Sequence, residues 1–288
     1  MGLGDEIMVT GEARRAQERD PRPVAVRGRD GRQRWHRLWA GNPRLATPQQ
    51  VAAGLHVQWI VNGPGCRPYV DYETMRREFE SVFPGRPFTT KVRDPRLPWR
   101  FTDWRAEPGE LPGIDKIEPR GYLVVEPHVK AGASPNKQWG RERWQALVAS
   151  LRLPGHPWVQ LGPPGTRRLE GVGHVVTETF EAACTALSGA AAAVLPDGGL
   201  HHAAAALGVP AVVIFGGCAS PANLGYGRHV NLFDPAGEAS PCGQRVPCRH
   251  CAEAMNAIRP DIVAYHVEQI LRHERTPESQ AGRWRLAS

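Results

Sequence analysis

The sequence predicts an α/β fold in which helices cover both faces of a parallel sheet. Between residues 121 and 272, short apolar segments with strand character alternate with segments of helical periodicity. Strands that are apolar along their whole length are typical of parallel sheets that are buried on both sides. With 288 residues, 41% of them hydrophobic, the chain can supply the cores of two compact domains.

The C-terminal half gives the clearest order of elements. We expect strands at residues 122–126, 158–161, 174–176, 190–195 and 211–215. Helices are expected at residues 141–151, 180–187, 202–207 and 261–273. Gly208 closes the third of these helices. Strand and helix therefore alternate as in a doubly wound sheet.

The first 120 residues predict less regular structure. We expect a helix at residues 6–19 and strands at residues 23–26 and 56–61. Seven prolines between Pro84 and Pro119 indicate an irregular connector rather than further helices or strands. We therefore expect two domains, residues 1–120 and residues 121–288.

Composition narrows the class of protein. The formal net charge is +7, and no apolar run approaches the roughly 20 residues of a membrane span. Because the N-terminus also lacks the pattern of a signal peptide, we expect a cytoplasmic protein, with the membrane surface as a second location. Six cysteines in that compartment should stay mostly reduced.

Arginines are concentrated near the N-terminus. Residues 14–44 contain ten arginines and three acidic residues, an excess of seven positive charges. Such a segment is either a solvated face or a platform for a phosphate-bearing acceptor, such as a glycan, a lipid-linked molecule or modified nucleic acid. The spacing of the arginines matches no nucleic-acid-binding motif.

One strand-to-helix turn has the features of an anion site. The segment Asp197-Gly198-Gly199-Leu200-His201-His202 follows an apolar strand and leads into four alanines. Glycines let a ligand approach the backbone, and the unpaired amides at a helix N-terminus favour negative charge. An ordinary tight turn is the alternative for this segment taken alone.

Three further loops follow predicted strands of the same half. The first contains Lys130, Ser134 and Lys137, the second is the turn at residues 162–165, and the third contains Gly217. Because the carboxyl ends of parallel strands meet at one edge of a sheet, these loops should lie together. Lysine charge and backbone amides at one edge would suit a diphosphate.

Three motifs in this half resemble glycosyltransferase family 9, the heptosyltransferase-like enzymes. They are Asn136-Lys137-Gln138-Trp139 with Trp144 and Leu147, the segment from Asp197 to Pro210, and Phe215-Gly216 with Ser220-Pro221. The order and spacing match over roughly residues 121–272. This resemblance implies a GT-B fold, with two Rossmann-like domains whose parallel sheets face an interdomain cleft. It also implies inverting transfer of a sugar from a nucleotide-diphosphate donor to a hydroxyl acceptor.

The resemblance also implies roles for individual residues. Gly2-Leu3-Gly4-Asp5 is similar to the family's first loop, and the family's candidate base maps to Asp5. An acceptor hydroxyl loses a proton as it attacks, so a carboxylate there would act as general base. A first-turn or N-cap acid of the helix is the alternative for Asp5. The expected donor contacts are Lys137, Asp197, Gly198, Gly199, Leu200 and His202, with Lys130, Ser134 and Gly217 as secondary contacts.

The chain departs from the family pattern in three ways. The family's first strand precedes the loop that here occupies Gly2 to Asp5, so we expect the N-terminal sheet to lack or replace it. Gly198 stands where the family has serine or threonine, which removes a hydroxyl. The acceptor domain is also short, which argues against a large lipid-linked core acceptor.

Metal binding is not expected in the transfer reaction. The sequence contains no Asp-x-Asp pair, and lysine with helix amides can stabilise a leaving diphosphate. No cofactor is expected besides the nucleotide-diphosphate sugar. Cys242, Cys248 and Cys251, beside His250, are either reduced buried thiols or zinc ligands. His201 and His202 should not share a metal, because adjacent helix positions face different directions.

Two other functions remain open from the sequence. One is a nucleotide-sugar epimerase on the same fold, which would turn over a donor without an acceptor. The other is a non-catalytic protein that binds nucleotide sugars or nucleic acid.

Overall fold

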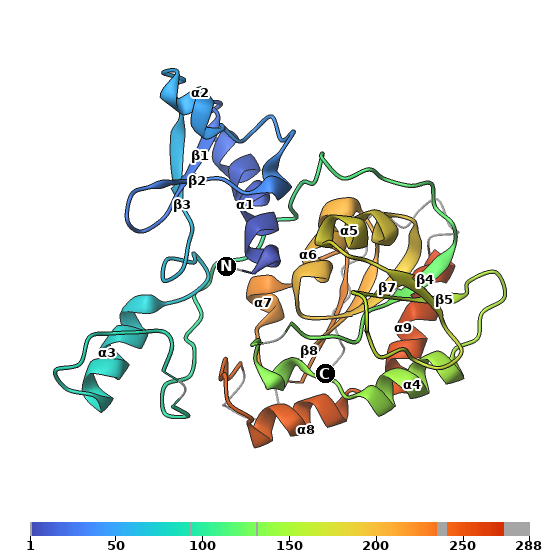
Figure 1. The fold of residues 1–288 in the computed structure, drawn as a ribbon. Coiled ribbons are helices and arrows are strands. Elements are labelled where there is room, and N and C mark those ends of the chain that lie inside the picture. Colours follow the sequence, from blue (N-terminus) through green and yellow to red (C-terminus); the bar gives the residue numbers. More distant parts are fainter. Residues whose placement is uncertain (1, 93, 131, 235–240, 274–288) are drawn as a thin grey trace.

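The computed structural model describes residues 2–92, 94–130, 132–234 and 241–273 (Figure 1). Within these residues the strands form two sheets, one of six strands in the order β6-β5-β4-β7-β8-β9 and one of three in the order β2-β1-β3. The strands of the large sheet are β4 Tyr122–Val125, β5 Trp158–Gly162, β6 Gly173–Val176, β7 Ala190–Pro196, β8 Ala211–Gly216 and β9 Val230–Phe233.

All strand pairs of the large sheet are parallel. Successive residues of β7 and β8 point to opposite faces, and each face meets its own apolar cluster. One face packs against α5 (Phe180–Ser188) and α6 (Gly199–Leu207). The other packs against α4 (Arg141–Ser150), α8 (Arg249–Ala257) and α9 (Pro260–His273). This confirms the predicted parallel sheet with helices on both faces.

The sheet of the N-terminal half is smaller, and it contains both parallel and antiparallel strand pairs. β1 (Val24–Arg27) pairs in parallel with β3 (Gln58–Val61) and antiparallel with β2 (Gln33–Arg34). The helices of this half are α1 Leu3–Gln17, the 3-10 helix η1 Arg37–Trp39, α2 Pro48–Ala52 and α3 Tyr72–Val82. Among the described residues between α3 and β4, no helix or strand occurs, as the prolines predicted.

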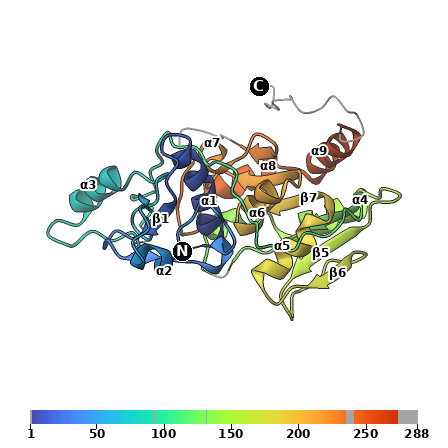
Figure 2. The same ribbon diagram turned by 90° about the horizontal axis from the view of Figure 1, so that it is seen from above.

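Helix α1 joins the two halves. It lies between the three-stranded sheet and α6 (Figures 1 and 2). Because it is covered on several sides, consecutive residues from Gly4 to Gly11 are buried, including Ile7 in the shared apolar cluster. An ion pair of 2.6 Å between Arg37 and Glu181 ties η1 to α5.

Several boundaries and elements differ from those expected. Helix α1 begins at Leu3, before the predicted residue 6, and α6 begins at Gly199 rather than at residue 202. The elements that the sequence did not predict are β2, η1, α2, α3, the 3-10 helix η2 (Pro135–Lys137), α7 (Pro221–Leu224), β9 and α8. Most are short, and β9 mixes polar and apolar residues, so its periodicity is weak. No helix in the described part of the chain is long and apolar enough to cross a bilayer.

Candidate active site

An ion pair between Lys137 and Asp197 lies at the C-terminal ends of the strands of the large sheet. Asp197 directly follows β7, and Lys137 ends the 3-10 helix η2 (Pro135–Lys137). Lys137 Nζ is 2.5 Å from Asp197 Oδ2. Burial opposes the charged form of Lys137, but attraction to Asp197 outweighs it and raises the pKa of the ammonium group. Two loops that the sequence placed at one edge are thus in direct contact.

The N-terminus of α6 begins immediately after Asp197. The backbone of Gly198 is extended, with a φ of −176° that any residue adopts, and a Cβ there would have its nearest neighbour at 3.8 Å. Glycine is therefore not required at position 198. Gly199 is more confined, because a Cβ would lie 3.1 Å from the ring of Phe180. Leu200 follows and packs partly buried against the apolar cluster.

His201 is held as a neutral ring. The backbone amide of Gly198 donates to its Nδ1 at 3.0 Å, so Nε2 carries the proton and donates to the Leu224 carbonyl at 3.0 Å. Burial lowers the pKa of His201, in agreement with this pairing. The ring lies beside that of His202, with 3.8 Å between centroids. The expectation that these histidines face different directions was wrong.

His202 lies where α1 meets α6. Its Nδ1 is 2.6 Å from the hydroxyl of Tyr226, and burial lowers its pKa well below the usual value. On the α1 side, a Cβ on Gly4 would lie 2.4 Å from His202 Cδ2. Gly4 therefore allows a backbone approach that no other residue would allow. This contact brings the first turn of α1, which carries Asp5, next to the Asp197 turn.

Asp5 lies in the first turn of α1 rather than in a loop before it. Its Oδ1 accepts a hydrogen bond from the Tyr69 hydroxyl and lies 3.0 Å from Arg67 Nε. Its Oδ2 accepts from the Gly2 amide at 2.8 Å and from Arg67 Nη2 at 3.2 Å. Three hydrogen bonds and this ion-pair contact thus engage both oxygens of the carboxylate. The charge of Asp5 also helps to raise the pKa of Lys137.

The secondary donor residues make contacts of their own. Lys130 is exposed in the loop after β4. The Ser134 hydroxyl donates to the Gln244 carbonyl at 2.6 Å, and the Gly217 carbonyl accepts from the Cys242 amide at 3.1 Å. Ser134 and Gly217 therefore contact the segment before α8. Lys137, Asp197 and His202 are brought together, with Asp5 across the contact between α1 and α6.

Sequence reasoning missed several polar residues near the site. Arg67 and Tyr69 hold Asp5, Tyr226 holds His202, and Arg34 pairs with Glu6 at 2.9 Å. Burial opposes the charged form of Arg67, but attraction to its neighbours, Asp5 among them, outweighs it and raises the pKa of the guanidinium, while burial raises the pKa of the Tyr69 hydroxyl. These residues are isolated in the sequence, so no spacing pattern could have indicated them.

The arginine-rich segment is largely neutralised. Six of its ten arginines form ion pairs with carboxylates, most of which lie outside residues 14–44. The six are Arg14, Arg15, Arg22, Arg34, Arg37 and Arg44. The local count of charges therefore overstated the positive potential, because it omitted partners such as Glu107 and Glu110.

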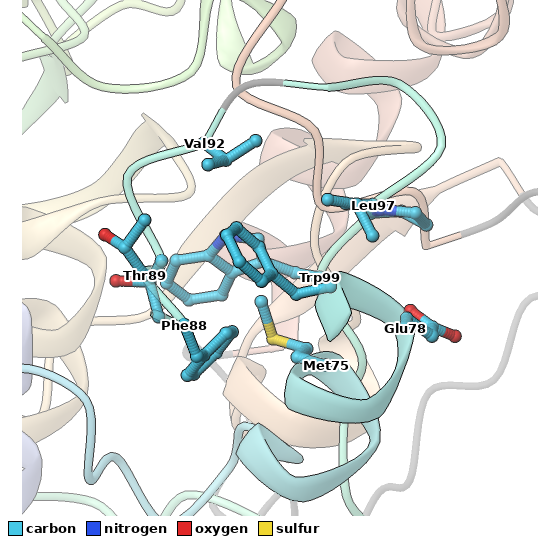
Figure 3. A pocket seen from close by; sticks show the side chains of 10 residues that line it. Met75, Glu78, Phe88, Thr89, Val92, Leu97 and Trp99 are labelled. Atoms are coloured by element: carbon cyan, nitrogen blue, oxygen red, sulfur yellow. The ribbon is translucent and has the colours of Figure 1, made fainter. Parts of the chain in front are cut away.

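A small recess lies between α3 and the segments at residues 88–92 and 97–99. Its lining is mostly apolar and includes Met75, Phe88 and Trp99 (Figure 3). A second cavity lies beside Trp35 and Leu45 in the N-terminal half. Neither includes Lys137 or Asp197, but Trp99 connects the first to the site because the Arg67 guanidinium lies 5.5 Å from its ring.

Two groups of potential metal ligands occur in the described part of the chain. One is Asp197, His201 and His202, and the other is Cys242, Cys248, His250 and Cys251. In the first group, the Lys137 ammonium occupies the Asp197 carboxylate and both nitrogens of His201 are hydrogen-bonded. In the first group, the Lys137 ammonium therefore contacts one of the carboxylate oxygens that a metal ion would need.

Comparison with solved structures supports the fold. TibC from enterotoxigenic E. coli H10407, described as an iron-containing dodecameric glycosyltransferase, is 16% identical, with a TM-score of 0.59 over 94% of this chain and 74% of that chain. A family 9 glycosyl transferase from Veillonella parvula DSM 2008 is 14% identical, with a TM-score of 0.53 over 94% and 95%. E. coli heptosyltransferase WaaC with ADP is 16% identical, with a TM-score of 0.50 over 94% and 97%.

Other alignments are shorter. The chain spans about half the length, 49%, of E. coli heptosyltransferase II and of TibC in its ADP-D-beta-D-heptose complex. No curated protein sequence matches the chain significantly. At these identities the structural likeness shows an α/β fold of the GT-B type.

The family assignment comes from the sequence itself. The pattern of glycosyltransferase family 9 (heptosyltransferase) matches residues 103–247, half of the chain. The match includes Lys137, the Asp197 turn, α6 and the loop after β8. It begins within the proline-rich connector and ends before α8, so it is displaced from the span of 121–272 expected above. The chain belongs to glycosyltransferase family 9.

Proposed function

We propose that this chain transfers a sugar from a nucleotide-diphosphate donor to a hydroxyl acceptor with inversion at the anomeric carbon. The observation that carries the proposal is the ion pair of Lys137 with Asp197 at the N-terminus of α6. A diphosphate would take over the lysine charge and accept hydrogen bonds from the first amides of the helix, at Gly199 and Leu200. The family assignment favours the same donor class.

We propose that these groups stabilise the leaving nucleoside diphosphate without a divalent cation. Negative charge develops on the diphosphate as the bond between its oxygen and the anomeric carbon breaks. A preorganised ammonium group and helix amides would stabilise that charge. His202 is neutral, so its imidazole would contribute a hydrogen bond rather than a charge. Added Mg²⁺ or Mn²⁺ should leave turnover unchanged.

Asp5 is the proposed general base, taking the proton of the acceptor hydroxyl. Both of its oxygens already accept hydrogen bonds, from Tyr69, Arg67 and Gly2, so an acceptor hydroxyl would approach beside these partners or replace one of them. Glu6 is the second candidate, since its Oε1 pairs with Arg34 while its buried Oε2 has no hydrogen-bond partner. A glycan-type acceptor, with or without phosphate, fits the family.

Binding of nucleoside diphosphates tests the proposal most directly. ADP is the first probe, because WaaC was solved with ADP, and UDP, GDP and dTDP complete the panel. A ligand at 100 times its dissociation constant should stabilise the fold by about 2.7 kcal/mol. A rise in melting temperature with one nucleotide, followed by consumption of the matching nucleotide sugar only when an acceptor is present, would support transfer. Equal consumption without an acceptor, or no stabilisation by any nucleotide, would contradict it.

A further inference from the structure

Four cysteines gather behind the turn that carries Lys137. Cys218 follows β8, Cys242 follows β9, and Cys248 and Cys251 lie at the start of α8. Cys218, Cys242 and Cys251 are buried together, with Cys248 packed against them. All four are free thiols. Cys242, Cys248 and Cys251 come from one short segment, and the fold brings Cys218 to them from the loop after β8.

The distances in this cluster are those of a compact metal site. Cys242, Cys248, Cys251 and His250 each present one ligand atom, and these atoms lie within 4.8 Å of one another. Cys251 Sγ is 3.7 Å from His250 Nδ1 and 2.9 Å from Cys242 Sγ. Around a tetrahedral zinc ion, sulfur and nitrogen ligands lie about 3.6 Å apart and two sulfurs about 3.8 Å apart. Side-chain movements of about 1 Å would therefore suffice.

The surroundings favour thiolates. Cys248 is the N-cap of α8 and Cys251 lies in its first turn, where the helix dipole and free amides stabilise negative sulfur. Metal ligation requires deprotonated sulfur, and the protons would be released on binding.

We infer that Cys242, Cys248 and Cys251 hold one thiophilic metal ion, zinc or iron, with His250 or Cys218 as the fourth ligand. Four protein ligands leave no open position for a substrate, so the ion would be structural. It would fix the segment before α8 against the back of the Lys137 turn. There the Cys248 amide donates to Asn136 Oδ1 at 3.0 Å, and the Gly243 amide donates to the Cys218 carbonyl at 2.8 Å.

The test is the metal content of the full chain, purified under reducing conditions without a histidine tag. Elemental analysis should find close to one equivalent of zinc or iron, and separate expressions in zinc-supplemented and iron-supplemented medium distinguish the two metals. Cys248→Ser and Cys251→Ser should each lower the content at least tenfold. Cys66→Ser is the matched control, because Cys66 lies outside the cluster, and it should keep the wild-type content.

Two variants identify the fourth ligand. Of His250→Ala and Cys218→Ser, the variant that removes the fourth ligand should lower the metal content. When the proteins are reconstituted with cobalt, the visible spectrum of that variant should differ from that of the wild type. If a variant fails to fold, wild-type protein stripped of metal by chelator under reducing conditions should rebind one cobalt ion per chain. Less than a tenth of an equivalent in wild type, no cobalt uptake, or unchanged content in Cys248→Ser would overturn the inference. A disulfide between Cys242 and Cys251 under reducing conditions, detected by mass spectrometry, would also overturn it.

Discussion

The Lys137 ammonium lies 2.5 Å from a carboxylate that is only 3% exposed, so the charges of Lys137 and Asp197 cannot be altered independently. Removing the lysine alone leaves a buried carboxylate without its partner, which destabilises the fold as well as the site. Substitutions at this pair must therefore separate folding from binding.

Lys137→Ala should weaken binding of the nucleotide that stabilises the wild type by on the order of 1.5–3 kcal/mol, because one charged hydrogen bond is lost. Titration calorimetry measures this affinity. Lys137→Ala combined with Asp197→Asn should recover thermal stability but not affinity, since the unpaired charge is gone. Lys116→Ala, at an exposed position outside the predicted donor contacts, is the control and should bind normally. Unchanged affinity in Lys137→Ala would remove that lysine from the donor site.

Asp5→Asn should lower the transfer rate ~10²-fold or more with little change in donor affinity, because a general base acts in the transition state. Steady-state kinetics with one donor and one acceptor measures the effect. Glu6→Gln is the comparison, since Glu6 has a buried oxygen without a hydrogen-bond partner. Near-normal turnover in Asp5→Asn together with a large loss in Glu6→Gln would assign the base to Glu6.

At the scale of elements, the contact between α1 and α6 positions the site. Gly4→Ala should destabilise the protein by about 1–3 kcal/mol, because the new methyl group would overlap the ring of His202. Urea unfolding measures the change. Gly227→Ala is the matched control, since a Cβ there meets nothing within 4 Å. Equal stability of the two variants would show that α1 can shift away from α6 without cost.

The elements that could be predicted are those with strong periodicity and buried strands. β4, β5, β7 and β8 matched their apolar segments closely, and their order along the chain was enough to place Lys137 and Asp197 at one edge of the sheet. α3 and α8 were missed although apolar residues recur at helical spacing in both, and α3 stands just before the proline-rich connector. Gly4 and His202, or Asp5 and Tyr69, meet only through tertiary packing, so local patterns could not reveal their contacts.

At the scale of the whole molecule, buried neutral histidines make stability depend on pH. Burial lowers the pKa of His201, of His202, and of His229 to about 3. Below about pH 6.5 these histidines become protonated in the unfolded chain but stay neutral in the folded protein. Their contribution to the free energy of unfolding is therefore complete above that pH and decreases as the pH falls toward 3.

The free energy of unfolding should therefore decrease from pH 7.5 to pH 5.5, by up to about 1.4 kcal/mol per pH unit for each histidine that stays neutral. Urea titrations at several pH values measure the slope. His229→Gln should reduce it, and His56→Gln, at an exposed position, should leave it unchanged. A stability that is flat over this range would contradict the assignment of neutral buried rings.

The dependence of α1 on α6 also has a consequence for synthesis of the chain. α1 ends at Gln17, and the helix that covers it begins at Gly199. At roughly 5–20 residues per second, a ribosome needs about 10–40 seconds to make the intervening segment. During that time the apolar surface around Ile7 lacks its final partner. The apolar side of α1, the helix that carries Asp5, therefore stays uncovered until α6 has been synthesised. Chaperones can bind this surface during that time.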